Sequence, residues 1–336
     1  MKVLRCEKPH HFEYHEFSLP TLLVGETLLR VRRVGVCGTD IHAFEGTQPY
    51  FNYPRILGHE LAAEIVQTTA EDFVQGELVT VIPYKSCGDC VACRHGKTNC
   101  CVLMQVLGVH VDGGMAEYLV VPNDLLIKSK GLQLDELVLV EPLAISAHAI
   151  RRANVQSGGY VLVVGAGPIG LGLMEFARLA GSQVIALDVN ESRLAFCNDK
   201  LRVEHTVNVA KEQAFEALWR ITNGSMPTTI FDATGNLKAI EQAFQYLAHG
   251  GTYVLVGIQK GNISFSHPEF HKRESTLMSS RNATKGDFDF VIDCIRNKSI
   301  DPTLFVTHRI PFDDLVRQFE MFVDPRNKII KAIVEV

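Results

Sequence analysis

The chain has 336 residues, of which 46% are hydrophobic and 21% charged, and its formal net charge is −5. At roughly 150 residues per domain, this length predicts two domains with cores large enough to exclude long disorder. The acidic balance excludes the basic surface that binding to nucleic acid or to an anionic membrane requires. We therefore expect a small-molecule substrate, and neither nucleic acid nor a membrane as a partner.

The sequence predicts neither a membrane span nor a secretory signal. The longest uncharged stretch, 153–174, is interrupted by glycines and a proline and is a poor membrane span. At the N-terminus, Arg5, Glu7 and Lys8 leave no apolar region of secretory length. A cytoplasmic location is therefore expected.

The first 145 residues predict a mostly β domain. Short runs rich in apolar and β-branched residues, bounded by Gly, Pro and Asp, lie at 27–36, 60–68, 78–82 and 116–121. No long helical period interrupts them.

From residue 159 onward, apolar strand-like runs alternate with helix-like stretches. The expected strands are 160–165, 183–188, 228–235 and 252–258, and the expected helices are 168–180, 191–201, 211–222 and 237–248. This alternation is typical of a parallel sheet with helices on both faces, a doubly wound α/β domain that covers 146–283. After it, a helix at 287–298 and a strand at 328–336 are expected to return to the first domain, so that 284–336 completes it.

A four-cysteine motif is the strongest single feature. Because thiols stay free in a reducing compartment, the nine cysteines of the chain need another explanation than disulfides. Four of them have the spacing with which thiolates surround one zinc ion tetrahedrally. They are Cys87, Cys90, Cys93 and Cys101. Such a closed site holds a loop in place and does not catalyse; Cys100 could replace Cys101, and a set of free or redox-active thiols is the alternative.

A glycine-rich turn follows the expected strand 160–165 and opens the next helix. The turn consists of Gly165, Ala166, Gly167, Pro168, Ile169 and Gly170. Its first glycine allows a tight turn, the second lets a pyrophosphate approach the backbone, and the third allows close packing of helix and strand. The pyrophosphate of a dinucleotide would lie at the helix N-terminus, where free N–H groups favour anions. A glycine turn without a nucleotide is the alternative.

Asp188 ends the following strand and indicates which dinucleotide is bound. Its carboxylate can accept hydrogen bonds from both ribose hydroxyls and would repel a 2′-phosphate, which favours NAD over NADP. Arg193 is close enough in sequence to contact a phosphate instead. The expected cofactor contacts are completed at the end of the strand 252–258 by Val256, Gly257 and Ile258.

A third group of residues combines soft ligands with oxygen ligands. Cys37 and His59 supply a thiolate and an imidazole, the mixed donors that an open zinc site uses. Glu60 and Glu141 offer carboxylate oxygens. Taken singly, each histidine is more readily explained as a hydrogen-bonded structural residue.

Together these motifs resemble the zinc-dependent medium-chain alcohol and polyol dehydrogenases. The segments that carry the resemblance occur in the family's order: CGTDIH, GHE, the four-cysteine segment, DGGMAEY, EPLA and VVGAGPIG. The resemblance covers the whole chain and implies a GroES-like catalytic domain that is split by a Rossmann domain. It also implies NAD, one catalytic and one structural zinc, and a homodimer or homotetramer with 252–258 as an edge strand at the interface.

The resemblance further implies which residues hold the catalytic zinc. Cys37 and His59 would be ligands, and Glu60 would ligate the ion directly or exchange with water. Many alcohol dehydrogenases have a cysteine at the position of Glu141. The glutamate at this position resembles the sorbitol and threonine dehydrogenase branch instead. The third protein ligand is therefore left open.

Around these ligands, the resemblance implies one orienting residue and a proton relay. Asp40 would orient His59. Thr39 and His42 would carry the proton of the substrate away through the nicotinamide ribose. The implied reaction is oxidation of a secondary alcohol, with transfer of hydride to NAD.

Segments beyond the zinc motifs resemble members of the family that oxidise sugar acids. These segments are 37–60, 96–101, 141–153, 268–275 and 280–284. A sugar acid or a polyol is therefore the expected substrate class. His110 and Arg281 are candidates for binding a substrate carboxylate, although Arg281 could instead contact the cofactor and His110 support a loop.

Other possibilities remain open in the sequence. The chain could oxidise a different polyol, of the sorbitol or galactitol type, or L-threonine, or it could bind zinc and a nucleotide without turnover. Phe44, Tyr50 and Phe51, which follow His42, line a pocket or pack the first domain.

Overall fold

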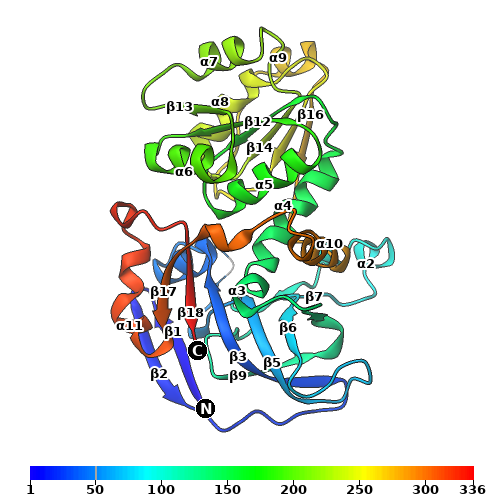
Figure 1. The fold of residues 1–336 in the computed structure, drawn as a ribbon, viewed down its shortest axis with the longest axis vertical. Helices are drawn as coiled ribbons and strands as arrows, with labels where there is room; N and C mark the ends of the chain where they lie inside the picture. Colours follow the sequence, from blue (N-terminus) through cyan, green and yellow to red (C-terminus); the bar gives the residue numbers. More distant parts are fainter. Residues whose placement is uncertain (50) are drawn as a thin grey trace. The chain divides into compact units, whose positions relative to one another are not determined.

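Apolar and polar residues alternate along the N-terminal part of the chain, and there they form antiparallel sheets with one buried face. The computed structural model describes residues 1–49 and 51–336. These divide into unit 1, Met1–Ala144 with Ala283–Val336, and unit 2, Ile145–Asn282. Figure 1 shows strands dominating the first unit and a helix-flanked sheet in the second. The predicted pair of fold types, one mostly β and one doubly wound α/β, is confirmed.

The main sheet of unit 1 has seven strands, in the order β10-β6-β5-β3-β18-β17, with β9 also paired to β3. Its strands are β3 (Glu26–Val36), β5 (Glu60–Thr68), β6 (Leu78–Val81), β9 (Tyr118–Pro122), β10 (Leu126–Lys128), β17 (Val306–Pro311) and β18 (Lys331–Glu335). Strand β18 comes from the C-terminal segment and pairs antiparallel with β3, with Ala332 opposite Val36. This pairing joins the C-terminal strand of the chain to a strand of its N-terminal part.

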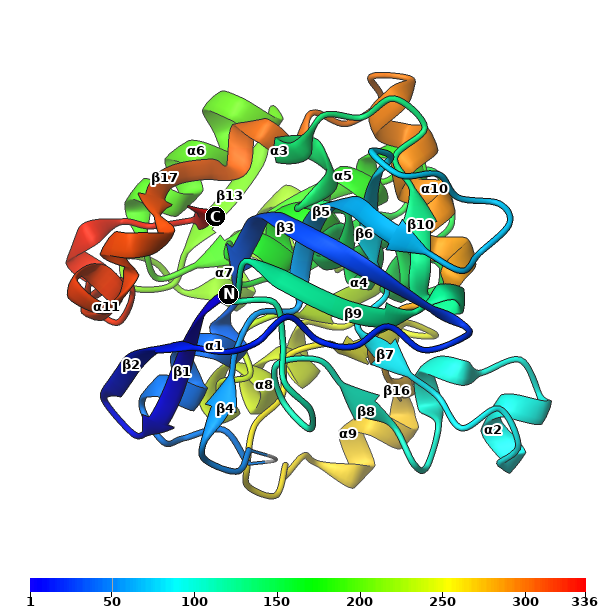
Figure 2. The same ribbon diagram turned by 90° about the horizontal axis from the view of Figure 1, so that it is seen from below.

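Two smaller sheets complete unit 1. One contains β1 (Lys2–Lys8), β2 (His11–Glu16) and β4 (Arg55–Ile56), which Figure 2 shows side by side, and the other contains β7 (Tyr84–Lys85) and β8 (Gln105–Val106). The ring of Phe44 is 4% exposed and stacks on Phe12 at a centroid distance of 5.2 Å, so Phe44 packs this domain. Phe51 contacts the ring of Tyr53 at 4.7 Å, and Tyr50 lies outside the described residues.

Short helices connect the strands of unit 1. They are α1 (Gly38–Phe44), α2 (Val91–Arg94), α3 (Leu134–Leu137), α10 (Lys285–Arg296) and α11 (Leu315–Gln318), with 3-10 helices η1 (Thr98–Cys100), η2 (Asn123–Leu125), η4 (Pro302–Phe305), η5 (Phe312–Asp314), η6 (Phe319–Phe322) and η7 (Pro325–Asn327). Helix α4 (Val140–Ala153) begins in unit 1 and continues into unit 2. In the part of the chain that the structure describes, no helix is both long and apolar enough to cross a membrane.

Unit 2 contains a six-stranded sheet in the order β13-β12-β11-β14-β15-β16, and every neighbouring pair is parallel. Its strands are β11 (Tyr160–Val164), β12 (Gln183–Asp188), β13 (His205–Asn208), β14 (Thr229–Asp232), β15 (Thr252–Leu255) and β16 (Thr276–Ser279). Its helices are α5 (Pro168–Leu179), α6 (Glu191–Leu201), α7 (Ala214–Ile221), α8 (Leu237–Ala243), η3 (Phe244–Tyr246) and α9 (His267–Lys272). Helices α7 and α8 pack on the face that carries Leu162 and Ile185, whereas Gly170 of α5 lies against Val163 on the other face (Figure 1).

Two expectations from the sequence are wrong. The run 252–258 was expected at the sheet edge, but β15 pairs with both β14 and β16, so β16 is the edge strand. Strand β16 is short and mostly exposed and lacks the apolar run of a buried strand, which explains why the pattern did not indicate it. No long helix was expected before residue 145, yet the 14-residue helix α4 begins at Val140. Its first ten residues are nearly all buried, so no polar face reveals a helical period.

Candidate active site

In unit 1, adjoining ends of two antiparallel strands bring a thiol, an imidazole and a carboxylate together. Cys37 follows β3 and is the N-cap residue of α1, while His59 directly precedes β5 and Glu60 is its first residue. The register sets Gly35 of β3 opposite Glu60. One donor atom from each of Cys37, His59 and Glu60 lies within 4.8 Å of the other two. The three side chains form a donor set that zinc accepts.

A buried carboxylate, Asp40, joins the two segments that carry these donors. Its Oδ2 accepts a hydrogen bond from the main-chain N–H of Cys37 at 2.9 Å, and its Oδ1 accepts from that of Gly58 at 3.2 Å. Oδ1 also lies 3.8 Å from Nδ1 of His59, which is close for opposite charges but too long for a hydrogen bond. Burial raises the pKa of Asp40, whereas His59 and the N–H donors lower it.

His59 has the environment of a metal ligand. The side chain is buried, and its Nδ1 has no hydrogen-bond partner within residues 1–49 and 51–336. Burial by itself lowers the pKa of His59, but the neighbouring Cys37 and Asp40 raise it well above its ordinary value. Groups that attract a proton to an imidazole in this way also attract a divalent cation.

Glu60 is paired with a buried lysine that the sequence analysis missed. Lys331, in β18, is 2% exposed; its Nζ contacts both carboxylate oxygens of Glu60 and donates to the main-chain oxygen of Val36 at 3.2 Å. Burial alone lowers the pKa of Lys331, but Glu60 and Cys37 raise it. Space for the carboxylate exists because residue 35 is glycine, since a Cβ there would lie 1.9 Å from Oε2 of Glu60. The only signal in the sequence was a lysine inside an apolar run.

Glu141 lies in the first turn of α4 and is 1% exposed. Its Oε1 accepts a hydrogen bond from the hydroxyl of Tyr84, while its Oε2 has no such partner among the described residues. Burial raises the pKa of Glu141 to about 7; His59 lowers it and Glu60 raises it. Glu141 is not part of the group of three donors, but the charges of His59, Glu60 and Lys331 all act on its pKa. Tyr84, like Lys331, was not predicted.

The two residues expected to move a proton lie on α1. Thr39 and His42 are three residues apart, which places them on one face of the helix. The side chain of His42 is 61% exposed, and its Nδ1 lies 2.9 Å from Oγ1 of Thr47 and 3.7 Å from Oε2 of Glu45. Because Nδ1 faces these partners, Nε2 is the ring nitrogen that can exchange a proton with a ligand.

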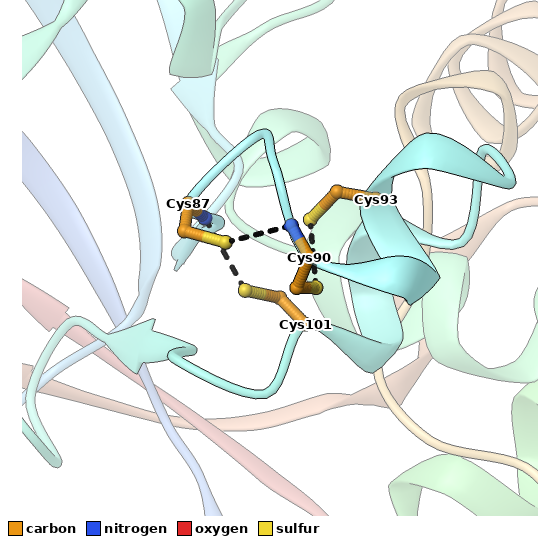
Figure 3. Close-up of side chains that lie close together, drawn as sticks. All are labelled: Cys87, Cys90, Cys93 and Cys101. Carbon is orange, nitrogen blue, oxygen red and sulfur yellow. Dashed lines mark hydrogen bonds between the residues drawn. The ribbon is translucent and has the colours of Figure 1, made fainter.

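The four predicted cysteines form a second cluster, in the lobe around α2. These residues are Cys87, Cys90, Cys93 and Cys101, whose sulfur atoms lie within 4.8 Å of one another. Figure 3 shows the four sulfurs turned toward a common centre. Main-chain N–H donors of Cys93 and Val102 lower the pKa of Cys90 to about 6, which favours the thiolate that zinc binds. Cys100 is exposed and does not belong to the cluster, so the arrangement fits one closed zinc site.

The glycine-rich turn lies between β11 and α5 in unit 2. Gly165 has φ +101°, in the left-handed region, and a Cβ at Gly170 would lie 1.8 Å from the main-chain oxygen of Gly165. At Gly167, the N-cap residue of α5, an added Cβ would meet only a guanidinium nitrogen of Arg193, at 4.0 Å. Pro168 opens the helix, where its fixed φ is favourable. The turn therefore leaves the N-terminus of α5 accessible to an anion.

Hydrogen bonds fix the carboxylate of Asp188 and the main-chain oxygen of Ile169 near this turn. Asp188 ends β12; its Oδ2 accepts from the N–H of Ala166 at 2.7 Å and its Oδ1 accepts from that of Asn190 at 2.8 Å. Each oxygen keeps a second lone pair, which a ribose hydroxyl can use. The main-chain oxygen of Ile169 accepts from the hydroxyl of Ser146 at 3.0 Å.

Residues 256–258 lie at the same, carboxyl edge of the sheet. The N–H groups of Val256 and Gly257 both donate to the main-chain oxygen of Asp232 at 2.9 Å. A Cβ at Gly257 would lie 2.3 Å from the nitrogen of Gly235, so this close approach requires glycine. Ile258 is 64% exposed. Ligands of open parallel sheets bind at this edge.

Comparison with known proteins agrees with the possible zinc sites of unit 1 and with the nucleotide-binding turn of unit 2. Residues 24–132 match the family model of the alcohol dehydrogenase GroES-like domain, and residues 168–297 match that of the zinc-binding dehydrogenase. The chain belongs to the zinc-binding alcohol dehydrogenase family. The predicted GroES-like and Rossmann domains and the prediction of an oxidoreductase are thereby confirmed.

The relatives of this dehydrogenase include enzymes of sugar-acid metabolism. The chain is 42% identical to L-galactonate-5-dehydrogenase of Escherichia coli strain K12, over 99% of the chain and 98% of that protein. It is 31% identical to 2-dehydro-3-deoxy-L-galactonate 5-dehydrogenase of Pseudoalteromonas atlantica, over 93% and 92%. A short chain alcohol dehydrogenase from E. coli CFT073, solved with NADH, shares 30% identity and a TM-score of 0.93 over 100% of this chain and 99% of its own. The dehydrogenase is therefore of the zinc-type polyol and sugar-acid group.

The two candidates for the substrate carboxylate lie in different units of the dehydrogenase. His110, in unit 1, is exposed, and its Nδ1 accepts a hydrogen bond from the main-chain N–H of Val106 at 3.0 Å. This bond gives the ring the loop-supporting role named as the alternative. Arg281, in unit 2, is exposed and follows the end of β16 by two residues.

Proposed function

We propose that this dehydrogenase oxidises a secondary alcohol of a sugar acid with NAD as the hydride acceptor, and that its substrate is L-galactonate, which would become D-tagaturonate. The reaction type is supported by the group of Cys37, His59 and Glu60, in which His59 and Glu60 are buried and Cys37 is half-buried. The substrate is supported by the 42% identity to L-galactonate-5-dehydrogenase, which extends over nearly the full length of both chains.

Two parts of unit 1 would bind zinc. Cys37, His59 and Glu60 would hold the catalytic ion, which when bound acts as a Lewis acid and lowers the pKa of a coordinated hydroxyl group. The four-cysteine cluster would hold the structural ion. Asp40 keeps Cys37 and the segment before His59 at a fixed spacing through its two main-chain hydrogen bonds. With three protein donors, the ion would have room for the substrate hydroxyl group as a further ligand.

The remaining residues position the cofactor and remove the proton. The open turn at Gly167 and the N-terminus of α5 would bind the pyrophosphate, and Asp188 would accept hydrogen bonds from the adenosine ribose. NAD supplies the hydride-accepting carbon. The hydroxyl of Thr39 would accept the substrate's proton, and Nε2 of His42, at the exposed end of α1, would take it up and release it to water.

The substrate is tested by the initial rate of NADH formation with zinc-loaded protein. We expect kcat/KM for L-galactonate to exceed those for sorbitol, galactitol and L-threonine by about 100-fold or more, because a site that pairs with a substrate group strongly rejects analogues that lack it. If kcat/KM for one of the other three compounds were equal or higher, that compound and not L-galactonate would be the substrate. No turnover with any of them, with two zinc ions and bound NADH, would contradict the substrate but not the reaction type.

The cofactor preference is tested with Asp188→Asn. The amide keeps an oxygen acceptor for the N–H of Ala166 but loses the negative charge that repels a 2′-phosphate. We expect the ratio of kcat/KM for NAD to that for NADP to fall about tenfold or more, which corresponds to about 1.4 kcal/mol. Asp232→Asn, at the end of the neighbouring strand β14, is the matched control and should leave the ratio unchanged. An unchanged ratio in Asp188→Asn would mean that another group recognises the ribose.

A further inference from the structure

Tyr84 and Glu141 form a buried hydrogen-bonded pair in unit 1, and the charges of His59 and Glu60 act on Glu141. The hydroxyl of Tyr84, the first residue of β7, donates a hydrogen bond to Oε1 of Glu141, 57 positions further along the chain. Both side chains are buried, with 6% and 1% exposure. The ring of Tyr84 packs edge-on against Phe288 at a centroid distance of 6.4 Å. That contact needs the ring and not the hydroxyl, so the hydroxyl requires a separate explanation.

Other tyrosines of this chain, one buried and two half-buried, show what a tyrosine hydroxyl ordinarily does in this fold. Tyr14, Tyr53 and Tyr253 all donate to main-chain carbonyl oxygens, as most buried side-chain donors do. Tyr84 instead donates to a carboxylate oxygen. Burial and the charge of Glu141 raise the pKa of Tyr84 well above its ordinary value, so its hydroxyl remains a donor. The bond therefore fixes the orientation of a buried carboxylate.

The other carboxylate oxygen is the one without a partner. Oε2 of Glu141 is buried and accepts no hydrogen bond within the described part of the chain. An orphaned buried oxygen is costly and typical of sites that receive a ligand. Burial raises the pKa of Glu141 to about 7, while the charge of His59 lowers it, so Glu141 and His59 are close enough for their charges to interact.

We propose that Tyr84 is a positioning residue of the catalytic zinc site, which holds Oε1 of Glu141 and so keeps Oε2 available to the ion or to the hydroxyl group bound on it. This inference rests on the proposed function, because it requires zinc at Cys37, His59 and Glu60. Tyr84 touches neither substrate nor cofactor in this role and acts through Glu141. Loss of such a partner typically costs a metal site 10- to 100-fold in affinity or activity, so roughly that effect is expected here.

The test is Tyr84→Phe, which keeps the ring and removes the hydroxyl. Release of zinc to the chelator 4-(2-pyridylazo)resorcinol is followed in holoenzyme, and the phase from the four-cysteine site is identified with Cys37→Ser, which should hold only that ion. We expect release from the catalytic site to accelerate about tenfold or more. We also expect kcat to fall about 10- to 100-fold, with KM for NAD changed less than about twofold. Release and kcat both within twofold of wild type would overturn the proposal.

Control variants separate this role from a general loss of packing. Tyr253→Phe removes a buried tyrosine hydroxyl in unit 2 and should leave zinc release unchanged. In a Glu141→Gln background, Tyr84→Phe should have no further effect, whereas an additive effect would show that Tyr84 does not act through Glu141. If Tyr84→Phe does not fold, Glu141→Asp withdraws the carboxylate from the hydroxyl and should cause the same loss. Wild-type protein with a single zinc would contradict the proposed function itself, whereas two zinc ions and an unaffected Tyr84→Phe would contradict this inference alone.

Discussion

Replacing Cys37 by serine is expected to reduce kcat by about three orders of magnitude or more and to lower the zinc content from two ions to one. A serine hydroxyl is not ionised at neutral pH and is a hard, weak ligand, so the group with His59 and Glu60 loses its thiolate. The Lewis acid supplies several kcal/mol of stabilisation to the transition state, and each 1.4 kcal/mol is about a factor of ten. Turnover is measured with L-galactonate and NAD, and zinc by mass spectrometry after dialysis.

Cys100→Ser is the matched control for this substitution. Cys100 is an exposed thiol next to Cys101 that lies outside both donor groups, so its loss should leave turnover and both zinc ions intact. If Cys37→Ser kept its activity while losing one zinc, Cys37 would hold an ion that plays no part in catalysis. If it lost activity with both ions retained, the thiolate would act on the substrate and not on the metal.

Local sequence spacing predicted the parts of the sites whose geometry is set by a few consecutive residues. The four cysteines lie close together in sequence and converge in the structure, with Cys101 and not Cys100 as the fourth. The glycine turn behaves likewise, because contacts within five residues decide it: a Cβ at Gly170 would collide with Gly165. In the same way, the apolar runs at β11 and β12 predicted the centre of the parallel sheet.

Contacts between distant segments could not be predicted in this way. Lys331 meets Glu60 only because β18 pairs with β3 at the far end of the chain, and no local pattern reports that pairing. Tyr84 and Glu141 join β7 to α4, and Glu141 itself lies on a helix whose buried surroundings hide its period. The edge strand β16 was also missed. Its residues are mostly exposed, so they show too little of the hydrophobic pattern by which a strand is recognised.

Replacing Lys331 by methionine is expected to lower the free energy of unfolding by about 3–5 kcal/mol in protein stripped of zinc. Methionine replaces the aliphatic stem of lysine but not its ammonium group, so the carboxylate of Glu60 is left buried without a cation. An unpaired buried charge is among the costliest single changes. The loss is measured by urea denaturation. Lys331→Met combined with Glu60→Gln should recover most of it, because both charges are then absent. Lys211→Met is the control, because its ion pair with Glu191 is exposed and contributes little.

The same variant distinguishes the two candidates for the third zinc ligand. If Glu60 ligates the ion, zinc supplies the positive charge that Lys331→Met lacks, so the stability difference from wild type should shrink on zinc loading. By linkage, the variant should then bind zinc more tightly than wild type, because the ion no longer competes with an ammonium group for the carboxylate. We expect this result, since Glu60 and not Glu141 lies within 4.8 Å of Cys37 and His59. A stability difference that zinc leaves unchanged would exclude Glu60 as a ligand and assign the third position to Glu141. Lysine and zinc would then be competing partners of one carboxylate, that of Glu60.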